Sequence, residues 1–298
     1  MKNVIVAGAN GFIGSAFVNK LTQNKVNVIA IDVAFTKIFD NNYVTEVLMP
    51  NDVSQLKALI PLRTYDAFYN FAWCGVNGVD KADPLVQLQN TSLTITFAKL
   101  AKSLDCSKYL CAGTIAEQSC HSLSSLKKTN GGMMYGVVKH CTNLILETYC
   151  KNIDLNFVWM QFSNIYGPSN KTGNLVSYTL EKLHHGLNAT FGPASQPYDF
   201  IYIDDLVDAI YRLGFNKTKH NSYFIGSGKP RILKDYLIEI GELCNCSDLI
   251  KIGERADDGI KYSFDMFDNS KLVEDIGEYV NVDFRTGIIN TVNSYKEN

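Results

Sequence analysis

The sequence contains no apolar run of the ~18 residues that a membrane-spanning helix needs. We also expect no signal peptide, because Met1-Lys2-Asn3 leads into a short apolar run that ends in glycines rather than at a cleavage site. No basic cluster interrupts the balance of 28 Lys plus Arg against 30 Asp plus Glu. We therefore expect a cytoplasmic protein whose partners are neither membranes nor nucleic acids.

Neither disulfides nor a metal site is indicated. The eight cysteines are scattered, mostly within apolar segments, whereas a disulfide framework is typical of short secreted chains. Cys244-Asn245-Cys246 lacks the second ligand pair that zinc requires. We expect free thiols and no bound metal.

What the chain does have is apolar surface for a large core, with hydrophobic residues making up 46% of its 298 positions. In the first half, short apolar strands alternate with amphipathic helices, which predicts an α/β fold with a Rossmann-type, doubly wound parallel sheet. Strands are expected at 4–7, 26–31, 44–48, 67–72, 109–112 and 155–161, and helices at 13–21, 84–104 and 133–150.

Beyond residue 165 the alternation loosens, and Gly and Pro separate shorter elements. One more strand at 199–203 and a helix at 206–213 resemble the first half. We therefore predict a domain at 1–165, rejoined by about 199–215, and a smaller, interleaved C-terminal lobe at 166–298.

Three glycines lie between the first strand and the first helix. Gly8, Gly11 and Gly14 have the spacing G-x-x-G-x-x-G, with Phe12 and Ile13 inside the loop. Such a loop lets the backbone approach a pyrophosphate at a helix N-terminus, which predicts dinucleotide binding.

Two aspartates follow later strands. Asp32 ends the second strand, where a carboxylate accepts hydrogen bonds from an adenosine ribose and repels a 2′-phosphate, so NAD is favoured over NADP. The alternative for Asp32 is a turn cap. Asp52, with Val53, is a candidate for the adenine end of the cofactor or a simple N-cap. NADP remains possible. We also expect Phe71 and Ala72, at the end of the fourth strand, to contact the cofactor.

A catalytic pattern follows in the second half of this domain. Tyr135 and Lys139 lie four residues apart and share one helix face. A nearby ammonium lowers the pKa of a phenol and suits it to acid–base work on an alcohol–ketone pair. Thr114, just after the fifth strand, could bond the reacting oxygen.

Together these residues resemble the extended short-chain dehydrogenase/reductase superfamily and its NAD-dependent epimerase/dehydratase family, which modifies nucleotide sugars. Further similar segments are 164–168 (N-I-Y-G-P), 199–206 (D-F-I-Y-I-D-D-L), 224–230 (F-I-G-S-G-K-P) and 255–258 (R-A-D-D).

The resemblance implies a nucleotide-diphosphate sugar as substrate and a role for each matching residue. Tyr135 would be the general acid/base, Lys139 would bind the nicotinamide ribose and tune Tyr135, and Thr114 would position the reacting oxygen. Candidates for the substrate contacts are Asn164 and Asn174 near the sugar–diphosphate, Arg255 at the diphosphate and Asp258 near the nucleotide ribose. For the last two, a surface salt bridge is the alternative.

Departures from the family pattern narrow the chemistry. Ile115 and Ala116 replace the Asp-Glu pair of 4,6-dehydratases, and Ala116 replaces the cysteine of 3,5-epimerases. Tyr198 occupies the place of a diphosphate-binding arginine. Two roles stay open: Glu117 is a second acid/base or a solvated loop carboxylate, and Trp73 narrows the cleft or packs.

Hydride transfer at C4 of the sugar remains. The leading hypothesis is a 4-keto-sugar reductase, because the substrate lobe is compact, and the alternative is an NAD-dependent 4-epimerase. A non-catalytic nucleotide-binding scaffold or sensor is disfavoured by the complete Thr/Tyr/Lys set. The helices at 84–104 and 133–150 carry apolar residues around much of their circumference, which predicts a homodimer.

Overall fold

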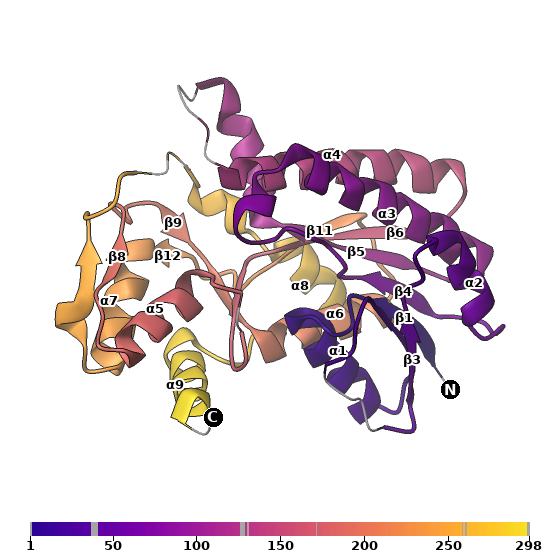
Figure 1. Ribbon diagram of the computed structural model, residues 1–298, viewed down its shortest axis with the longest axis horizontal. Coiled ribbons are helices and arrows are strands. Elements are labelled where there is room, and N and C mark those ends of the chain that lie inside the picture. The colour runs from indigo at the N-terminus through magenta and orange to yellow at the C-terminus, as the bar shows by residue number, and fades with distance from the viewer. Residues whose placement is uncertain are drawn as a thin grey trace.

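A seven-stranded parallel sheet forms the centre of the protein (Figure 1), with strand order β11-β6-β5-β4-β1-β2-β3. The computed structural model describes residues 2–36, 41–125, 129, 131–170, 172–257, 259 and 261–296. The strands are β1 (Asn3–Ala7), β2 (Asn27–Asp32), β3 (Val44–Leu48), β4 (Ala67–Asn70), β5 (Tyr109–Thr114), β6 (Phe157–Phe162) and β11 (Ser222–Ile225). The Rossmann-type architecture predicted from the alternation is confirmed.

Helices cover both faces of this sheet, with α3 and α4 on one side and α1 and α6 on the other (Figure 1). Their bounds are α1 (Phe12–Gln23), α3 (Pro84–Ser103), α4 (Gly131–Asn152) and α6 (Ile203–Phe215), and the short α2 (Leu56–Leu59) follows η1 (Val53–Gln55). Successive residues of β1 point to opposite faces: Val4 and Val6 pack into one core cluster, and Ile5 and Ala7 into the other. Two apolar layers therefore hold the sheet.

The C-terminal lobe lies at one end of the sheet (Figure 1). It contains α5 (Leu175–His184), β8 (Ala189–Phe191), β9 (Pro197–Tyr198), β12 (Arg231–Ile232), α7 (Leu233–Leu243), η4 (Ser247–Leu249), β13 (Ile250–Ile252), η5 (Phe264–Phe267) and α9 (Phe284–Lys296). The strand expected at 199–203 is β10 (Phe200–Tyr202), which pairs with β7 (Asn164–Tyr166). The chain crosses between lobe and sheet repeatedly, because α6, β11 and α8 (Ser270–Ile276) pack on the sheet side.

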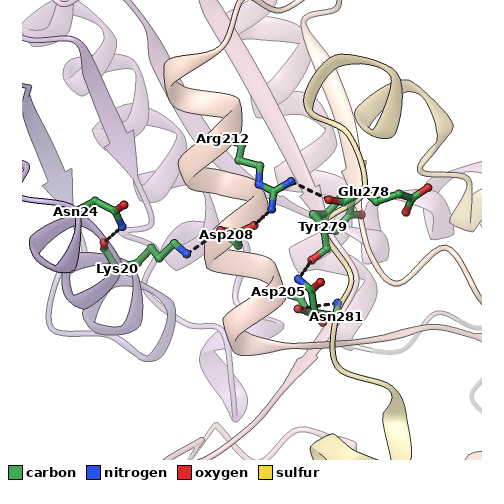
Figure 2. Close-up of polar contacts among 8 residues, drawn as sticks. All are labelled: Lys20, Asn24, Asp205, Asp208, Arg212, Glu278, Tyr279 and Asn281. Carbon is green, nitrogen blue, oxygen red and sulfur yellow. Dashed lines mark hydrogen bonds and ion pairs between the residues drawn. The ribbon is translucent and has the colours of Figure 1, made fainter.

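Helix α6 ties α1 to the C-terminal segment (Figure 2). The Asp208 carboxylate accepts from Lys20 Nζ at 2.7 Å and from the Arg212 guanidinium at 2.6 Å. One turn earlier, the Asp205 carboxylate accepts backbone N–H groups of Asn281 and Val282, both at 3.0 Å. These contacts hold α1 and the segment around Asn281 and Val282 against α6.

Within the described residues, none of the helices has the length and apolar character needed to cross a bilayer. The same part of the chain holds no group of three or more His, Cys, Asp or Glu side chains placed to bind a metal ion.

Candidate active site

The glycine loop between β1 and α1 is closely packed against neighbouring backbone. Gly8 has φ +76°, and a Cβ there would lie 2.6 Å from the backbone nitrogen of Ala72. A Cβ on Gly14 would lie 2.0 Å from the carbonyl oxygen of Gly8. Gly11 precedes α1 and caps it without a side-chain hydrogen bond. The first amides of α1 therefore have no side chain over them, which fits a pyrophosphate.

Asp32 connects the end of β2 to this loop. Its carboxylate accepts the backbone N–H of Asn10 at 2.8 Å and that of Val33 at 2.7 Å. The side chain is half-buried, so it caps the turn and still faces the outside of the loop. Both roles expected for Asp32 are compatible with this position.

Asp52 is the N-cap of the 3₁₀ turn η1. Its carboxylate accepts the backbone N–H of Ser54 at 3.0 Å, and hydrogen bonding by the side chain and then the backbone of Ser54 keeps the pKa of Asp52 below its usual range. The geometry supports the N-cap alternative for Asp52, whereas a contact with the adenine remains a prediction for Asp52 and Val53.

A cavity of about 480 Å³ opens beside the glycine loop, at the carboxyl ends of β1, β4 and β5. Eleven of the predicted residues line it: Gly8, Gly11, Phe12, Ile13, Gly14, Phe71, Thr114, Tyr135, Lys139, Asn164 and Asn174. Asp32, Asp52, Val53, Ala72 and Arg255 lie outside its lining, and Asp258 lies outside the described residues.

Tyr135 and Lys139 both come from α4 and reach the same wall of this cavity. The Thr114 side chain lies beside the phenol of Tyr135 and acts to lower its pKa. Lys139 is buried, and its Nζ donates to the carbonyl oxygen of Ala112 at 2.6 Å. Nζ also lies 3.7 Å from the centroid of the Trp73 ring. The three residues expected to carry the chemistry are thus brought together.

The expected lowering of the Tyr135 pKa is wrong for this structure. Burial of the phenol and the negative charge of Glu117 together raise the pKa of Tyr135, and the hydrogen bond from Thr114 opposes them only in part. The ammonium of Lys139 does not offset this rise in the Tyr135 pKa, because it donates to the carbonyl oxygen of Ala112 and lies 5.9 Å from the Tyr135 ring centroid. Tyr135 is therefore a protonated phenol.

Glu117 is not the solvated loop carboxylate considered from the sequence. It lies in η3 (Ile115–Ser125), only 2% exposed, and turns away from the cavity. The Trp159 indole N–H donates to its carboxylate at 3.0 Å. The burial of Glu117 could not be predicted from the sequence, because the mixture of small polar and apolar residues in a 3₁₀ segment does not show which side faces the core.

Lys81 is a cavity residue that sequence reasoning missed. It ends the three-residue turn η2 (Val79–Lys81), and its Nζ lies 5.3 Å from the Tyr135 ring centroid. Burial lowers the pKa of Lys81. A turn this short has no periodicity from which its direction could have been predicted.

The cavity's remaining polar side chains are held by backbone. Asn164 donates to the carbonyl oxygen of Asp199 at 3.1 Å, and Asn174 donates to that of Ile165 at 2.6 Å. Asn174 also caps α5 by accepting the backbone N–H of Ser177. Both roles are structural and leave part of each side chain facing the cavity.

Trp73 narrows the cavity on the side of Tyr135. Its indole N–H donates to Gln87 at 2.9 Å, and its ring meets the Tyr135 ring edge-on at 6.2 Å between centroids. Both expectations for Trp73 hold, because it is packed in place and also lines the cavity.

A second cavity, of about 220 Å³, lies in the C-terminal lobe. Arg255, Tyr198, Phe191 and Tyr262 are among the residues that line it. Arg255 donates to the hydroxyl oxygens of Thr190 at 2.8 Å and Tyr178 at 2.6 Å. A salt bridge with Asp258 involves a residue outside the described ones, so that alternative stays a prediction. This places one guanidinium at the rim of an aromatic cavity.

Comparisons with known proteins agree with this architecture. Residues 4–226 match the model of the NAD dependent epimerase/dehydratase family. The CDP-abequose synthase of Salmonella typhimurium is 25% identical over 307 residues, which covers 96% of this chain and 95% of that protein. The dTDP-4-dehydro-6-deoxyglucose reductase of Escherichia coli is 22% identical over 256 residues, 78% of each chain. The UDP-glucose 4-epimerase of Thermotoga maritima, solved with UDP-glucose, has the same fold, with TM-score 0.84 and 19% identity over 99% of both chains.

Proposed function

This chain belongs to the NAD dependent epimerase/dehydratase family, and from this premise and its cavity we propose that it reduces the 4-keto group of a nucleotide-diphosphate sugar. The cofactor of the family is NAD. Two relatives named for nucleotide-sugar chemistry, a CDP-abequose synthase and a dTDP-4-dehydro-6-deoxyglucose reductase, support a substrate of this class.

One observation carries the choice of reaction. Among the described residues that line the main cavity, the ionisable side chains are Tyr135, Lys139 and Lys81, with no Asp, Glu, His or Cys. Dehydration and 3,5-epimerisation need a further group that takes or gives a proton at carbon, and Ile115 and Ala116 cannot do so. The nearest carboxylate, Glu117, is buried and directed at Trp159. A single acid/base supports hydride transfer at one carbinol carbon.

The chain's own residues have separable tasks in this reaction. Thr114 holds the reacting oxygen beside the Tyr135 hydroxyl. Tyr135, kept protonated by its burial, donates its proton to that oxygen as the ketone becomes an alcohol. Lys139, on the same wall of the cavity, is proposed to bind the nicotinamide ribose of the cofactor.

The glycine loop would hold the cofactor, since Gly8 and Gly14 have no room for a side chain and leave the N-terminus of α1 open. Phe71, Phe12 and Ile13 line the same side of the cavity. Bound NADH supplies the hydride that makes the reduction possible.

The second cavity is the proposed nucleotide end of the substrate site. Arg255 supplies positive charge at its rim, and the aromatic rings of Phe191, Tyr198 and Tyr262 supply apolar walls suited to a base. Asn164 and Asn174, which line the main cavity together with Tyr135, are the proposed contacts of the sugar–diphosphate.

A 4-epimerase is the second candidate, and Asp32 is the observation that favours it. A carboxylate at the end of β2 selects NAD, which suits a redox-neutral cycle in which one cofactor is reused. Mass spectrometry of the purified protein separates the two: NAD retained in near-stoichiometric amount favours the epimerase, and a protein without nucleotide favours the reductase.

The test of the reductase is an absorbance assay with NADH and 4-keto-6-deoxy sugars carried on CDP, dTDP or UDP. Loss of NADH absorbance, dependent on the keto sugar and matched by an alcohol product two mass units heavier, is the expected result. Conversion of an ordinary nucleotide hexose without NADH loss would instead establish the epimerase.

A further inference from the structure

Glu117 is a buried carboxylate beside the catalytic wall that the proposed reaction does not use. Its Oε1 accepts the backbone N–H of Thr114 at 2.7 Å. Its Oε2 accepts the indole N–H of Trp159 at 3.0 Å and the side-chain amide of Gln161 at 3.4 Å. All three partners are donors, and a protonated acid would turn a hydrogen toward one of them. The geometry therefore favours the ionised carboxylate.

The strand beside Glu117 is shaped around this contact. A Cβ on Gly113 would lie 2.3 Å from the Trp159 indole nitrogen and 2.7 Å from Glu117 Oε1. A side chain at Gly113 would push the indole and the carboxylate apart. The absence of a side chain on Gly113 lets the carboxylate accept the backbone N–H of Thr114 while the indole lies beside it.

Lys139 is a matching buried cation. Its two contacts, the carbonyl oxygen of Ala112 and the face of Trp73, both favour an ammonium over an amine. Nζ lies 5.8 Å from the centroid of the same Trp159 ring whose N–H donates to Glu117. The carboxylate and the ammonium thus lie near one indole without forming a direct ion pair within 4.0 Å in the described part of the chain.

Burial opposes both charges, and each charge supports the other. Burial raises the pKa of Glu117 and lowers the pKa of Lys139, while their mutual attraction opposes both shifts. The other ionisable groups that face this pair are Tyr135 on α4, Cys111 on β5 and Cys120 on η3. These groups are neutral in their ordinary forms, so Glu117 is the negative charge that Lys139 experiences most strongly.

We propose that Glu117 is a positioning residue which, across Trp159, keeps Lys139 protonated and holds the backbone of Thr114 in place for the proton step at Tyr135. The catalytic consequence rests on the proposed function. The pairing itself is a property of the free protein and can be measured without substrate or cofactor.

The sequence supplies a reporter for this pairing, because its two tryptophans, Trp73 and Trp159, both lie at the pair. Trp73→Phe leaves Trp159 as the single indole, hydrogen-bonded to the carboxylate in question. The emission of Trp159 is excited at the long-wavelength edge of tryptophan absorption, where tyrosine does not absorb. It is then measured as a function of pH in the ligand-free protein.

Lys139→Met in the Trp73→Phe protein removes the cation. The pH midpoint of the Trp159 emission titration should then rise by about one pH unit or more, because an isolated buried carboxylate holds its proton more tightly. Glu117→Gln should abolish that titration. Glu147→Gln, the same change at an exposed glutamate of α4, should leave the curve where it is.

Identical curves of emission against pH for the Trp73→Phe parent and its Lys139→Met variant would overturn the pairing of Glu117 with Lys139. A titration that persists in Glu117→Gln would overturn it as well. Should Glu117→Gln fail to fold, the Lys139→Met comparison decides alone. Because neither measurement involves turnover, a failed reductase assay and a failed pairing are distinguished. If the 4-keto reduction is observed, Glu117→Gln should also shift the pH profile of kcat.

Discussion

Tyr135 is the residue on which the proposed reaction depends most strongly. Tyr135→Phe removes the proton donor and keeps the ring that packs against Trp73, so turnover should fall by roughly 10²–10⁴-fold. NADH binding, followed by quenching of tryptophan emission, should be nearly unchanged. Tyr149→Phe on the same helix is the matched control and should behave as wild type. Turnover at the wild-type rate in Tyr135→Phe would remove Tyr135 from the mechanism.

Asp32 determines the cofactor preference at the same scale. NADH should bind more tightly than NADPH, because the carboxylate accepts from the ribose and repels a 2′-phosphate. Asp32→Ala should narrow the ratio of the two dissociation constants by about tenfold or more, equivalent to ~1.4 kcal/mol. Asp52→Ala, which removes only the cap of η1, should leave the ratio unchanged. Tighter binding of NADPH by the wild type would contradict the assignment.

At the scale of elements, regular helices and strands were predictable and short turns were not. The expected helices at 84–104 and 133–150 correspond to α3 and α4 within two residues, since long periodic patterns determine them. Strand β11 was missed, because four residues that lead into the glycine-rich segment 224–230 carry little pattern. The side-chain orientations of Glu117 and Lys81 depend on the 3₁₀ segments that carry them. Glu117 packs against Trp159 and Lys81 against Tyr135, and both partners are distant in the sequence.

The prediction that α3 and α4 carry apolar residues around much of their circumference needs correction at particular positions. Phe97, Leu100 and Val138 are buried in this chain's own core and offer nothing to a partner. Leu144 and Ile145, however, remain 52% and 43% exposed on α4. The exposed apolar surface that supports the homodimer is therefore smaller than the sequence indicated, and Leu88 on α3 extends it.

Light scattering at micromolar concentration tests the dimer. The wild type should have the mass of two chains, and Leu144→Glu with Ile145→Glu should shift it to one, because two charges would be buried in a twofold contact. Leu62→Glu is the control, since Leu62 is 87% exposed in a loop outside these helices. A wild type with the mass of a single chain would rule the dimer out.

At the scale of the whole molecule, α6 holds the C-terminal segment to the first domain through Asp205. Asp205→Asn replaces one of two acceptors for the backbone N–H groups of Asn281 and Val282 with a donor. We expect the free energy of unfolding to fall by about 1–3 kcal/mol, measured by urea denaturation. Asp235→Asn, an exposed aspartate on α7, should change it by less than about 0.5 kcal/mol. Equal stability of the two variants would show that this anchor contributes nothing.

The most direct test of the account follows hydride through the whole site. The protein is incubated with a 4-keto-6-deoxy nucleotide sugar and with NADH deuterated at the transferred position, and the sugar is analysed by mass spectrometry and NMR. The account predicts one deuterium at C4 of the product alcohol for each NADH consumed, and no incorporation with Tyr135→Phe. Deuterium at any other carbon, or a reduced sugar without deuterium, would contradict it.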